Sequence, residues 1–128
     1  MEFHHAGVAT DDADALADLY GTVLGAPVVH EERLDTLAVT FLDLGNGYFE
    51  LLEPLDESDT VARYIEREGP GIHHVALATA DVQGAIDAAR EAGVQPIDET
   101  PRAGAWGHEV AFLHPDSTGG VLLEFVGA

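Results

Sequence analysis

An internal repeat constrains the fold of this chain more strongly than any other feature of its 128 residues. The segment His5-Ala-Gly-Val-Ala-Thr10 returns 69 positions later as His74-Val-Ala-Leu-Ala-Thr79. The residues that coincide at this offset are His5 and His74, Ala9 and Ala78, Thr10 and Thr79, Asp12 and Asp81, and Asp18 and Asp87. Self-similarity at a fixed period means that one unit of structure occurs twice.

Both copies predict the same order of elements. Each begins with a short strand of small and β-branched residues, and an Asp-rich turn that can cap a helix follows it. The first helix ends near Gly25, and the second covers residues 82–92 and ends at Gly93. The three strands predicted after each helix cover residues 27–30, 36–44 and 48–52 in the first half and 94–97, 110–114 and 121–126 in the second.

This order predicts an α+β fold made of two paired βαβββ modules in a single domain. Residues 1–56 form the first module, residues 57–70 link the two, and residues 71–128 form the second. The linker contains a helix over residues 60–68, capped by Ser58 or Asp59 and ended by Gly69-Pro70. A module of about 55 residues is too small to be stable alone, so we expect the two to share a core.

The composition excludes several classes of function. Asp and Glu total 24, Lys and Arg total 5, and the net charge is −19, so nucleic acid and anionic membranes are poor partners. There is no cysteine for a disulfide or a thiolate metal site, and neither a secretory signal nor a membrane-spanning apolar run is visible. The acids are spread through apolar periodicities, which indicates a folded, cytoplasmic protein adapted to high salt.

Histidine and glutamate occupy duplicated strand positions. The first strand of each half supplies His5 or His74, and the last strand supplies Glu50 or Glu124 in an apolar setting. A single histidine or glutamate in a strand is usually structural or solvent-facing, but duplication of both favours a shared role. Two imidazoles and two carboxylates suit a divalent ion such as Co²⁺, Mn²⁺, Ni²⁺ or Zn²⁺.

Other histidines and the single tryptophan carry weaker signals. Strand alternation places His4 and His73 on the face opposite to the duplicated pair, so we interpret both as structural. His114 ends a strand before a proline and is a candidate for lining a ligand pocket. Trp106 lies in a Gly-rich loop, either as a lid or as an anchor of the loop.

Several strings of residues resemble the methylmalonyl-CoA epimerases of the vicinal-oxygen-chelate superfamily. The strings are Phe49-Glu-Leu-Leu-Glu-Pro54, Gly71-Ile-His-His74 and Phe112-Leu-His-Pro115, in this order and spacing. The resemblance implies metal-dependent epimerisation of methylmalonyl-CoA at C2 through a metal-stabilised enolate, by a homodimer that binds an acyl-CoA. It implies Co²⁺ first, with Mn²⁺, Ni²⁺, Mg²⁺ and Zn²⁺ as alternatives.

The resemblance also implies roles for individual residues. The metal ligands fall on His5, Glu50, His74 and Glu124, and the catalytic residues are Glu124 and Glu50. Coenzyme A is expected along Arg102, Gly104, Ala105 and His114.

One position departs from the pattern of the family. Some relatives carry a second catalytic glutamate where this chain has Val39, and the turn expected at residues 31–35 is short. Glu32, Asp35 and Glu50 are the candidates for the missing group. Two rival functions remain open at this point, a glyoxalase I-like isomerase with the same ligands and a small-molecule-binding protein without turnover.

Overall fold

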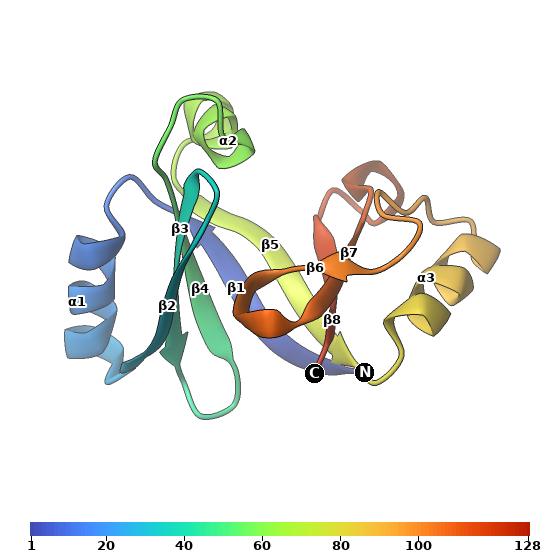
Figure 1. Cartoon of the computed structure of the whole chain (residues 1–128), viewed down its shortest axis with the longest axis horizontal. Helices are drawn as coiled ribbons and strands as arrows, with labels where there is room; N and C mark the ends of the chain where they lie inside the picture. The colour runs from blue at the N-terminus through green and yellow to red at the C-terminus, as the bar shows by residue number, and fades with distance from the viewer. The chain divides into compact units, whose positions relative to one another are not determined.

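The computed structural model describes residues 1–128, which divide into two compact units (Figure 1). One unit is His5–His73, and the other combines Met1–His4 with His74–Ala128. None of the helices is long and apolar enough to cross a membrane.

The first unit is built around a sheet with the strand order β2-β3-β4-β1. Its elements are β1 (Glu2–Ala9), of which residues 5–9 belong to this unit, α1 (Ala13–Leu24), β2 (Val28–Leu34), β3 (Leu37–Asp43), β4 (Tyr48–Pro54) and α2 (Thr60–Glu68). Strand β1 pairs in parallel with β4, while β3 pairs antiparallel with both β4 and β2.

The second unit repeats this connectivity with the strand order β5-β8-β7-β6. Its elements are β5 (Gly71–Thr79), of which residues 74–79 belong to this unit, α3 (Val82–Glu91), β6 (Arg102–Ala103), β7 (Glu109–Leu113) and β8 (Leu123–Gly127). Short 3-10 turns lie at Ala105–Gly107 and Pro115–Ser117. Strand β5 pairs in parallel with β8, and β7 pairs antiparallel with β8 and β6. The predicted α+β fold with two βαβββ modules is confirmed.

The duplicated aspartates start the duplicated helices. The Asp12 carboxylate accepts a hydrogen bond of 3.1 Å from the backbone N–H of Ala15, and the Asp81 carboxylate accepts one of 2.9 Å from Gly84. Each bond satisfies one of the N–H groups that a helix N-terminus leaves without an intrahelical partner. At the other end of α1, Gly25 adopts a left-handed φ of 66°, which only glycine adopts without steric cost.

Helix α2 has the bounds predicted from the sequence. Its N-cap is Asp59, whose carboxylate accepts from the backbone N–H of Val61 at 2.8 Å. The second carboxylate oxygen of Asp59 accepts from the Thr36 hydroxyl at 2.7 Å. One side chain therefore both starts the helix and ties it to the turn between β2 and β3.

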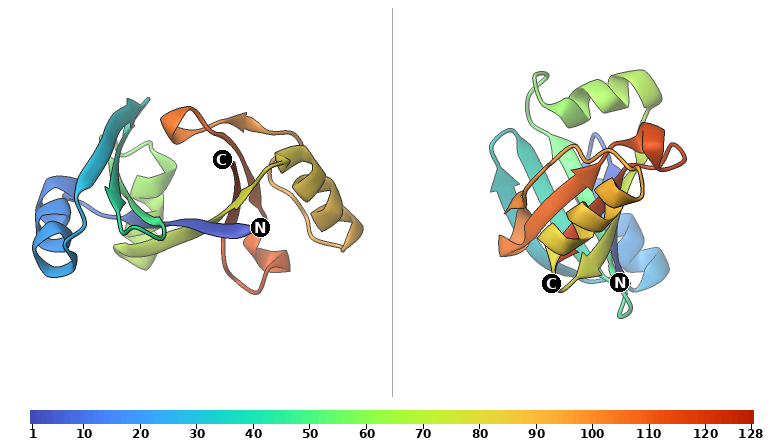
Figure 2. Two further views of the ribbon diagram at one scale, coloured as in Figure 1. Left: turned by 90° about the horizontal axis from the view of Figure 1, so that it is seen from below. Right: turned by 90° about the vertical axis from the view of Figure 1, so that its right-hand side faces the viewer.

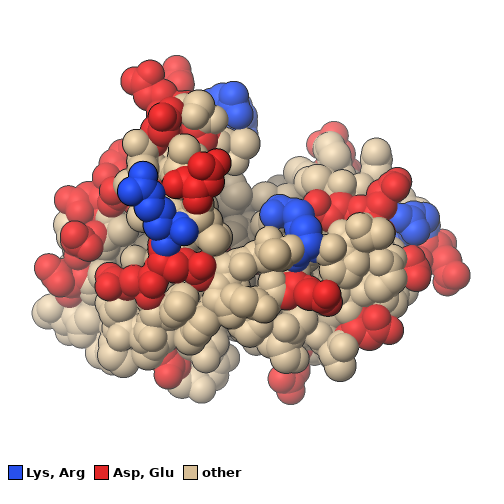
Figure 3. Space-filling view, viewed as in Figure 1, with Lys and Arg blue, Asp and Glu red and all other residues tan.

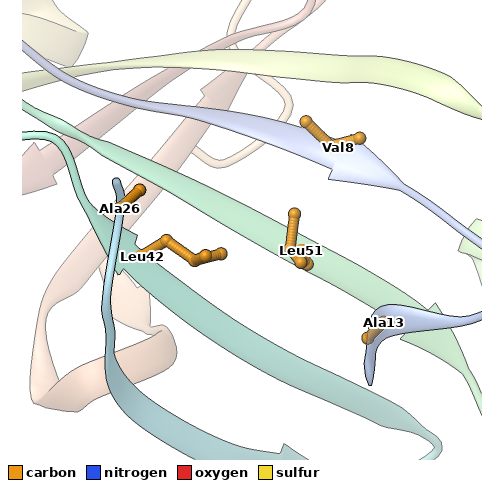
Figure 4. Packing of buried hydrophobic residues seen from close by; sticks show 5 residues of the cluster. All are labelled: Val8, Ala13, Ala26, Leu42 and Leu51. Atoms are coloured by element: carbon orange, nitrogen blue, oxygen red, sulfur yellow. The ribbon is translucent and has the colours of Figure 1, made fainter. Parts of the chain in front are cut away.

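Each sheet packs one of its faces against the helix of its own unit. In the first unit Val8, Leu42 and Leu51 are buried with Ala13 and Ala26, as Figure 4 shows. In the second unit α3 lies against β7 and β8 (Figure 2), and the buried residues there are Val82, Ile86, Ala111, Leu113 and Phe125. Because side chains alternate along a strand, residues one position away lie on the opposite face, which is turned from the helix.

Two of the predicted strand boundaries were wrong. The turn expected at residues 31–35 is strand as far as Leu34, and the turn itself is only Asp35 and Thr36. The consecutive charged residues Glu31, Glu32 and Arg33 resemble a turn in sequence, although charge also suits an edge strand with a solvated side.

The strand expected at residues 94–97 does not form. Pro96 makes only an isolated bridge to Leu113, and the short strand Arg102–Ala103 takes the place beside β7. Proline has no backbone N–H to donate to a ladder, which explains the difference.

Candidate active site

His5 and Glu50 form a buried pair in the first unit. The Nε2 atom of His5 lies 3.2 Å from a carboxylate oxygen of Glu50, and the two side chains are 4% and 8% exposed. Strand β1 brings them together because Gly7, two residues after His5, pairs with Glu50 on β4 and has no side chain to fill the space.

His74 and Glu124 form the equivalent pair in the second unit. Their Nε2 and Oε1 atoms lie 3.3 Å apart, and the side chains are again 4% and 8% exposed. Here Ala76, two residues after His74, pairs with Glu124 on β8. The sequence repeat is therefore a repeat of side-chain chemistry as well as of backbone structure.

A phenylalanine completes each pair. Phe41 lies opposite Glu50 in the β3–β4 ladder, and its ring meets the His5 ring edge-on at 5.6 Å. Phe112 lies opposite Glu124 in the β7–β8 ladder, and its ring meets His74 at 5.5 Å. Neither aromatic residue was predicted as part of the site, although each half has a phenylalanine in the strand before its glutamate.

The donor chemistry of these pairs fits a divalent metal ion. An ionised carboxylate is costly to bury unless it is paired or coordinated, and each glutamate is buried beside an imidazole. Imidazole nitrogen with carboxylate oxygen is a ligand combination that Co²⁺, Mn²⁺, Ni²⁺ and Zn²⁺ accept. Each unit offers one nitrogen and one oxygen ligand.

Arg102, predicted to bind substrate, lies in the same unit as His74 and Glu124. Its Nε donates to an Asp98 carboxylate oxygen at 3.0 Å, and its guanidinium carbon lies 5.4 Å from the centroid of the Phe112 ring. The other Asp98 oxygen accepts from the backbone N–H of Phe112 at 2.8 Å. Phe112 therefore contacts Arg102 as well as His74.

Gly104 and Ala105 follow Arg102 in the loop that leads to β7. A Cβ atom on Gly104 would lie 2.7 Å from a methyl group of Val110, so this position accepts only glycine without rearrangement. Ala105 begins the 3-10 turn that follows, in which Trp106 has a left-handed φ of 60°. The Trp106 ring lies 6.3 Å from that of His108.

His114 caps the turn after β7. Its Nδ1 accepts from the backbone N–H of Asp116 at 3.3 Å, and its side chain is 43% exposed. His4 and His73, interpreted as structural, have aromatic neighbours: His4 lies 5.4 Å from His108, and His73 lies 4.7 Å from Tyr64.

The candidates for a second acid or base lie in different settings. Val39 is buried on β3 with 1% exposure, and Glu32 lies directly opposite it on β2. The His30 Nε2 atom is 3.0 Å from a carboxylate oxygen of Glu32. Asp35 is exposed in the turn after β2 with a φ of 53°.

Comparison with known proteins agrees with this arrangement. A family model described as Glyoxalase/Bleomycin resistance protein/Dioxygenase superfamily matches residues 4–112. The ethylmalonyl-CoA/methylmalonyl-CoA epimerase of Cereibacter sphaeroides is 36% identical over 125 residues, which are 94% of this chain and 93% of that protein.

Solved structures of epimerases agree as well. The methylmalonyl-CoA epimerase of Mycobacterium tuberculosis is 33% identical with a TM-score of 0.92, over 98% of this chain and 86% of that one. A variant epimerase of Streptomyces coelicolor, in complex with 2-nitronate-propionyl-CoA, is 34% identical with a TM-score of 0.92, over 98% and 93%. The resemblance found in the sequence is thereby confirmed, and the chain belongs to the Glyoxalase/Bleomycin resistance protein/Dioxygenase superfamily.

Proposed function

We propose that this chain is a metal-dependent methylmalonyl-CoA epimerase. The observation that carries the proposal is the duplicated, buried His–Glu pair, in a chain that resembles proteins named as such epimerases over nearly its whole length. The reaction moves the hydrogen at C2 of methylmalonyl-CoA from one face of that carbon to the other. The chemical difficulty is that a proton beside a thioester is far less acidic than a side-chain carboxylic acid.

Both pairs together would hold one divalent ion. The ligands would be His5, Glu50, His74 and Glu124, with Co²⁺ as the first candidate and Mn²⁺, Ni²⁺, Mg²⁺ and Zn²⁺ as alternatives. A bound ion would supply Lewis-acid stabilisation of negative charge on the substrate oxygens, which is typically worth several kcal/mol.

Glu124 is the proposed proton-transfer group of the second unit. Its neighbours on the same face of the sheet include Ala76, Val110 and Val126, all buried and apolar. In such surroundings a carboxylate is poorly hydrated, which favours its role as a proton acceptor. A positioned general base usually accelerates a reaction by about 10²–10⁴-fold.

The first unit would supply the group that acts on the other face of C2. Glu50 and Glu32 both lie on the face of its sheet that is turned from α1.

Arg102 is the proposed contact for coenzyme A. The phosphates of coenzyme A are anionic, and the net charge of −19 on the chain repels them. The Arg102 guanidinium would provide a local positive charge that attracts a phosphate. Gly104, Ala105 and His114 belong to the same proposed region. A homodimer and a cytoplasmic location are further parts of the proposal, and light scattering after gel filtration tests the first.

Deuterium incorporation tests the activity. The protein is incubated with methylmalonyl-CoA in D₂O containing multimolar KCl and Co²⁺, and mass spectrometry follows labelling at C2. We expect rapid labelling that a chelator abolishes. The hemithioacetal of methylglyoxal and glutathione serves as the control substrate, and turnover of that compound without labelling at C2 would replace the proposal by a glyoxalase I-like reaction.

Metal stoichiometry tests the shared site. Calorimetric titration with Co²⁺ should give one ion per chain, and both His5→Ala and His74→Ala should weaken that single binding event. Two ions per chain, of which each variant removes one, would show that the pairs bind metal separately.

A further inference from the structure

We propose that Glu32 is the second proton-transfer group of the reaction, complementing Glu124. This inference rests on the proposed epimerase function. Epimerisation removes a proton on one face of a carbon and returns one on the other, so it requires an acceptor and a donor in two positions.

Strand register places Glu32 on the same face of its sheet as the metal-binding pair. Phe41 pairs with both His30 and Glu50, and Val39 pairs with both Glu32 and Leu52. Directly opposed residues of antiparallel strands project to the same side, and successive odd or even positions share a face. The rows His30–Phe41–Glu50 and Glu32–Val39–Leu52 are therefore adjacent on one surface.

Helix α1 does not cover this surface. The side chains that pack with α1 are those of Leu42 and Leu51, which lie one position away from Phe41 and Glu50 and so on the opposite face. Glu31 also lies on the α1 side, because it pairs with Thr40. Consecutive glutamates on β2 thus face opposite ways.

Three carboxylates lie on the surface that carries Phe41. Asp43 stands at the end of β3, where its side chain accepts from the backbone N–H of Gly45 at 2.7 Å. Glu50 is paired with His5 and only 8% exposed, which suits a ligand. Glu32 retains 24% exposure, so a substrate can reach it and its proton can exchange with water.

His30 holds the Glu32 carboxylate in place. The two side chains approach to 3.0 Å, and the His30 ring also lies 6.2 Å from the Phe41 ring that contacts His5. An acid or base whose orientation is fixed by a second polar group is the usual arrangement in enzymes that transfer protons. Val39 lies opposite Glu32 on β3, and its side chain is apolar and 1% exposed. At this row of the sheet the carboxylate that could transfer a proton therefore comes from β2 and not from β3.

The proposed step is balanced without a further reactant. The C2–H bond breaks, its proton goes to one of the two glutamates, and its electron pair delocalises into the thioester carbonyl. The other glutamate, which is protonated, then gives its proton to the opposite face of C2. Starting from the second epimer, Glu32 and Glu124 exchange roles.

The test compares Glu32→Gln with Glu31→Gln, a matched change on the same strand and opposite face. Each pure epimer is incubated in D₂O with Co²⁺, and inversion and deuterium labelling are measured separately. In the Glu32→Gln variant we expect inversion to fall by about 10²–10⁴-fold. One epimer should still acquire deuterium at C2 without inverting, because Glu124 can remove and return its proton on the same face. The other epimer should acquire no deuterium. The Glu31→Gln variant should behave as the unmodified protein.

Two results would overturn the proposal. Inversion at the unmodified rate would show that Glu32 transfers no proton, and equal loss of labelling from both epimers would reduce it to a positioning residue. Calorimetric Co²⁺ binding by Glu32→Gln, expected to be unchanged, gives a readout independent of turnover. If the unmodified protein neither labels nor inverts methylmalonyl-CoA, the proposed function itself fails, and the result is distinct from a failure of Glu32 alone.

Discussion

Glu50 and Glu124 are unusual because a carboxylate side chain is seldom buried so deeply. Each of the two is only 8% exposed. Glu50 and Glu124 each lie beside an imidazole and opposite a phenylalanine ring, so the surroundings are partly apolar and the partner is specific. This combination keeps a carboxylate poorly hydrated and correctly oriented, which suits both metal ligation and proton transfer.

Replacing Glu124 by glutamine should separate chemistry from folding. The side chains have nearly the same shape, but the amide cannot accept the substrate proton and is a weaker metal ligand. We expect epimerisation to fall by about 10²–10⁴-fold, while the far-UV circular dichroism spectrum stays unchanged. Glu109→Gln, at the exposed first position of β7, is the control. A Glu124→Gln enzyme within a few-fold of the unmodified rate would contradict the catalytic role.

Gly104 should matter for packing whether or not it touches coenzyme A. Because an added Cβ would lie 2.7 Å from Val110, Gly104→Ala is expected to destabilise the protein by about 1–3 kcal/mol, measured by urea unfolding. In a Val110→Ala background the same change should cost much less, since the opposing methyl groups are gone. Equal costs in the two backgrounds would disprove the steric explanation.

At the scale of elements, the two helices α1 and α3 begin in the same way. Thr10 and Thr79 each accept a hydrogen bond from the N–H of the capping aspartate, at 3.2 Å and 3.3 Å, and Asp12 and Asp81 then cap the helices. Both the threonine hydrogen bond before each helix and the aspartate cap that follows it are therefore duplicated.

Asp12→Ala and Asp81→Ala should consequently have similar effects. Each is expected to lower the free energy of unfolding by about 1 kcal/mol, through loss of one cap. Asp11→Ala is the control, because it removes an exposed neighbouring charge and leaves the cap intact. Urea unfolding of the three variants measures the costs, and a loss in Asp11→Ala as large as that in Asp12→Ala would assign the effect to charge rather than capping.

The elements that could be predicted are those with strong local signals. Helix α2 begins at a capping aspartate and ends before glycine and proline, and its bounds came out as expected. The predictions for the end of β2 and for residues 94–97 were wrong because strand formation there depends on neighbouring strands. Charged residues extend the edge strand β2, whereas Pro96 makes no more than an isolated bridge.

The same distinction applies to the candidate site. The histidines and glutamates were visible in the sequence because they are duplicated. Phe41, Phe112 and His30 were not recognised as parts of it, and Glu32 was only one of three candidates, since their relevance depends on which residue lies opposite on the next strand. Register is set by the whole sheet and its turns, and no local pattern in the sequence specified it here.

The surface of the molecule as a whole is strongly acidic. On the face drawn in Figure 3, Asp and Glu side chains are spread widely and Lys and Arg are few, in line with the net charge of −19. Repulsion among these charges acts over the Debye length, which is about 10 Å at 0.1 M salt and about 3 Å at 1 M. The folded state, in which the charges are concentrated, should therefore gain stability as salt is added.

We expect the melting temperature to rise by at least about 5 °C between 0.1 M and 2 M KCl, which corresponds to roughly 1 kcal/mol for a chain of this size. The control is the double variant Asp14→Asn/Asp18→Asn, which removes two exposed charges one helical turn apart on α1. If repulsion is the cause, this variant should be more stable than the unmodified protein at 0.1 M KCl and lose that advantage at 2 M, where the charges are already screened. An advantage of the same size at both concentrations would show that the two substitutions act through helix propensity or local hydrogen bonding, and the salt effect would then have to come from preferential exclusion of KCl rather than from the acidic surface.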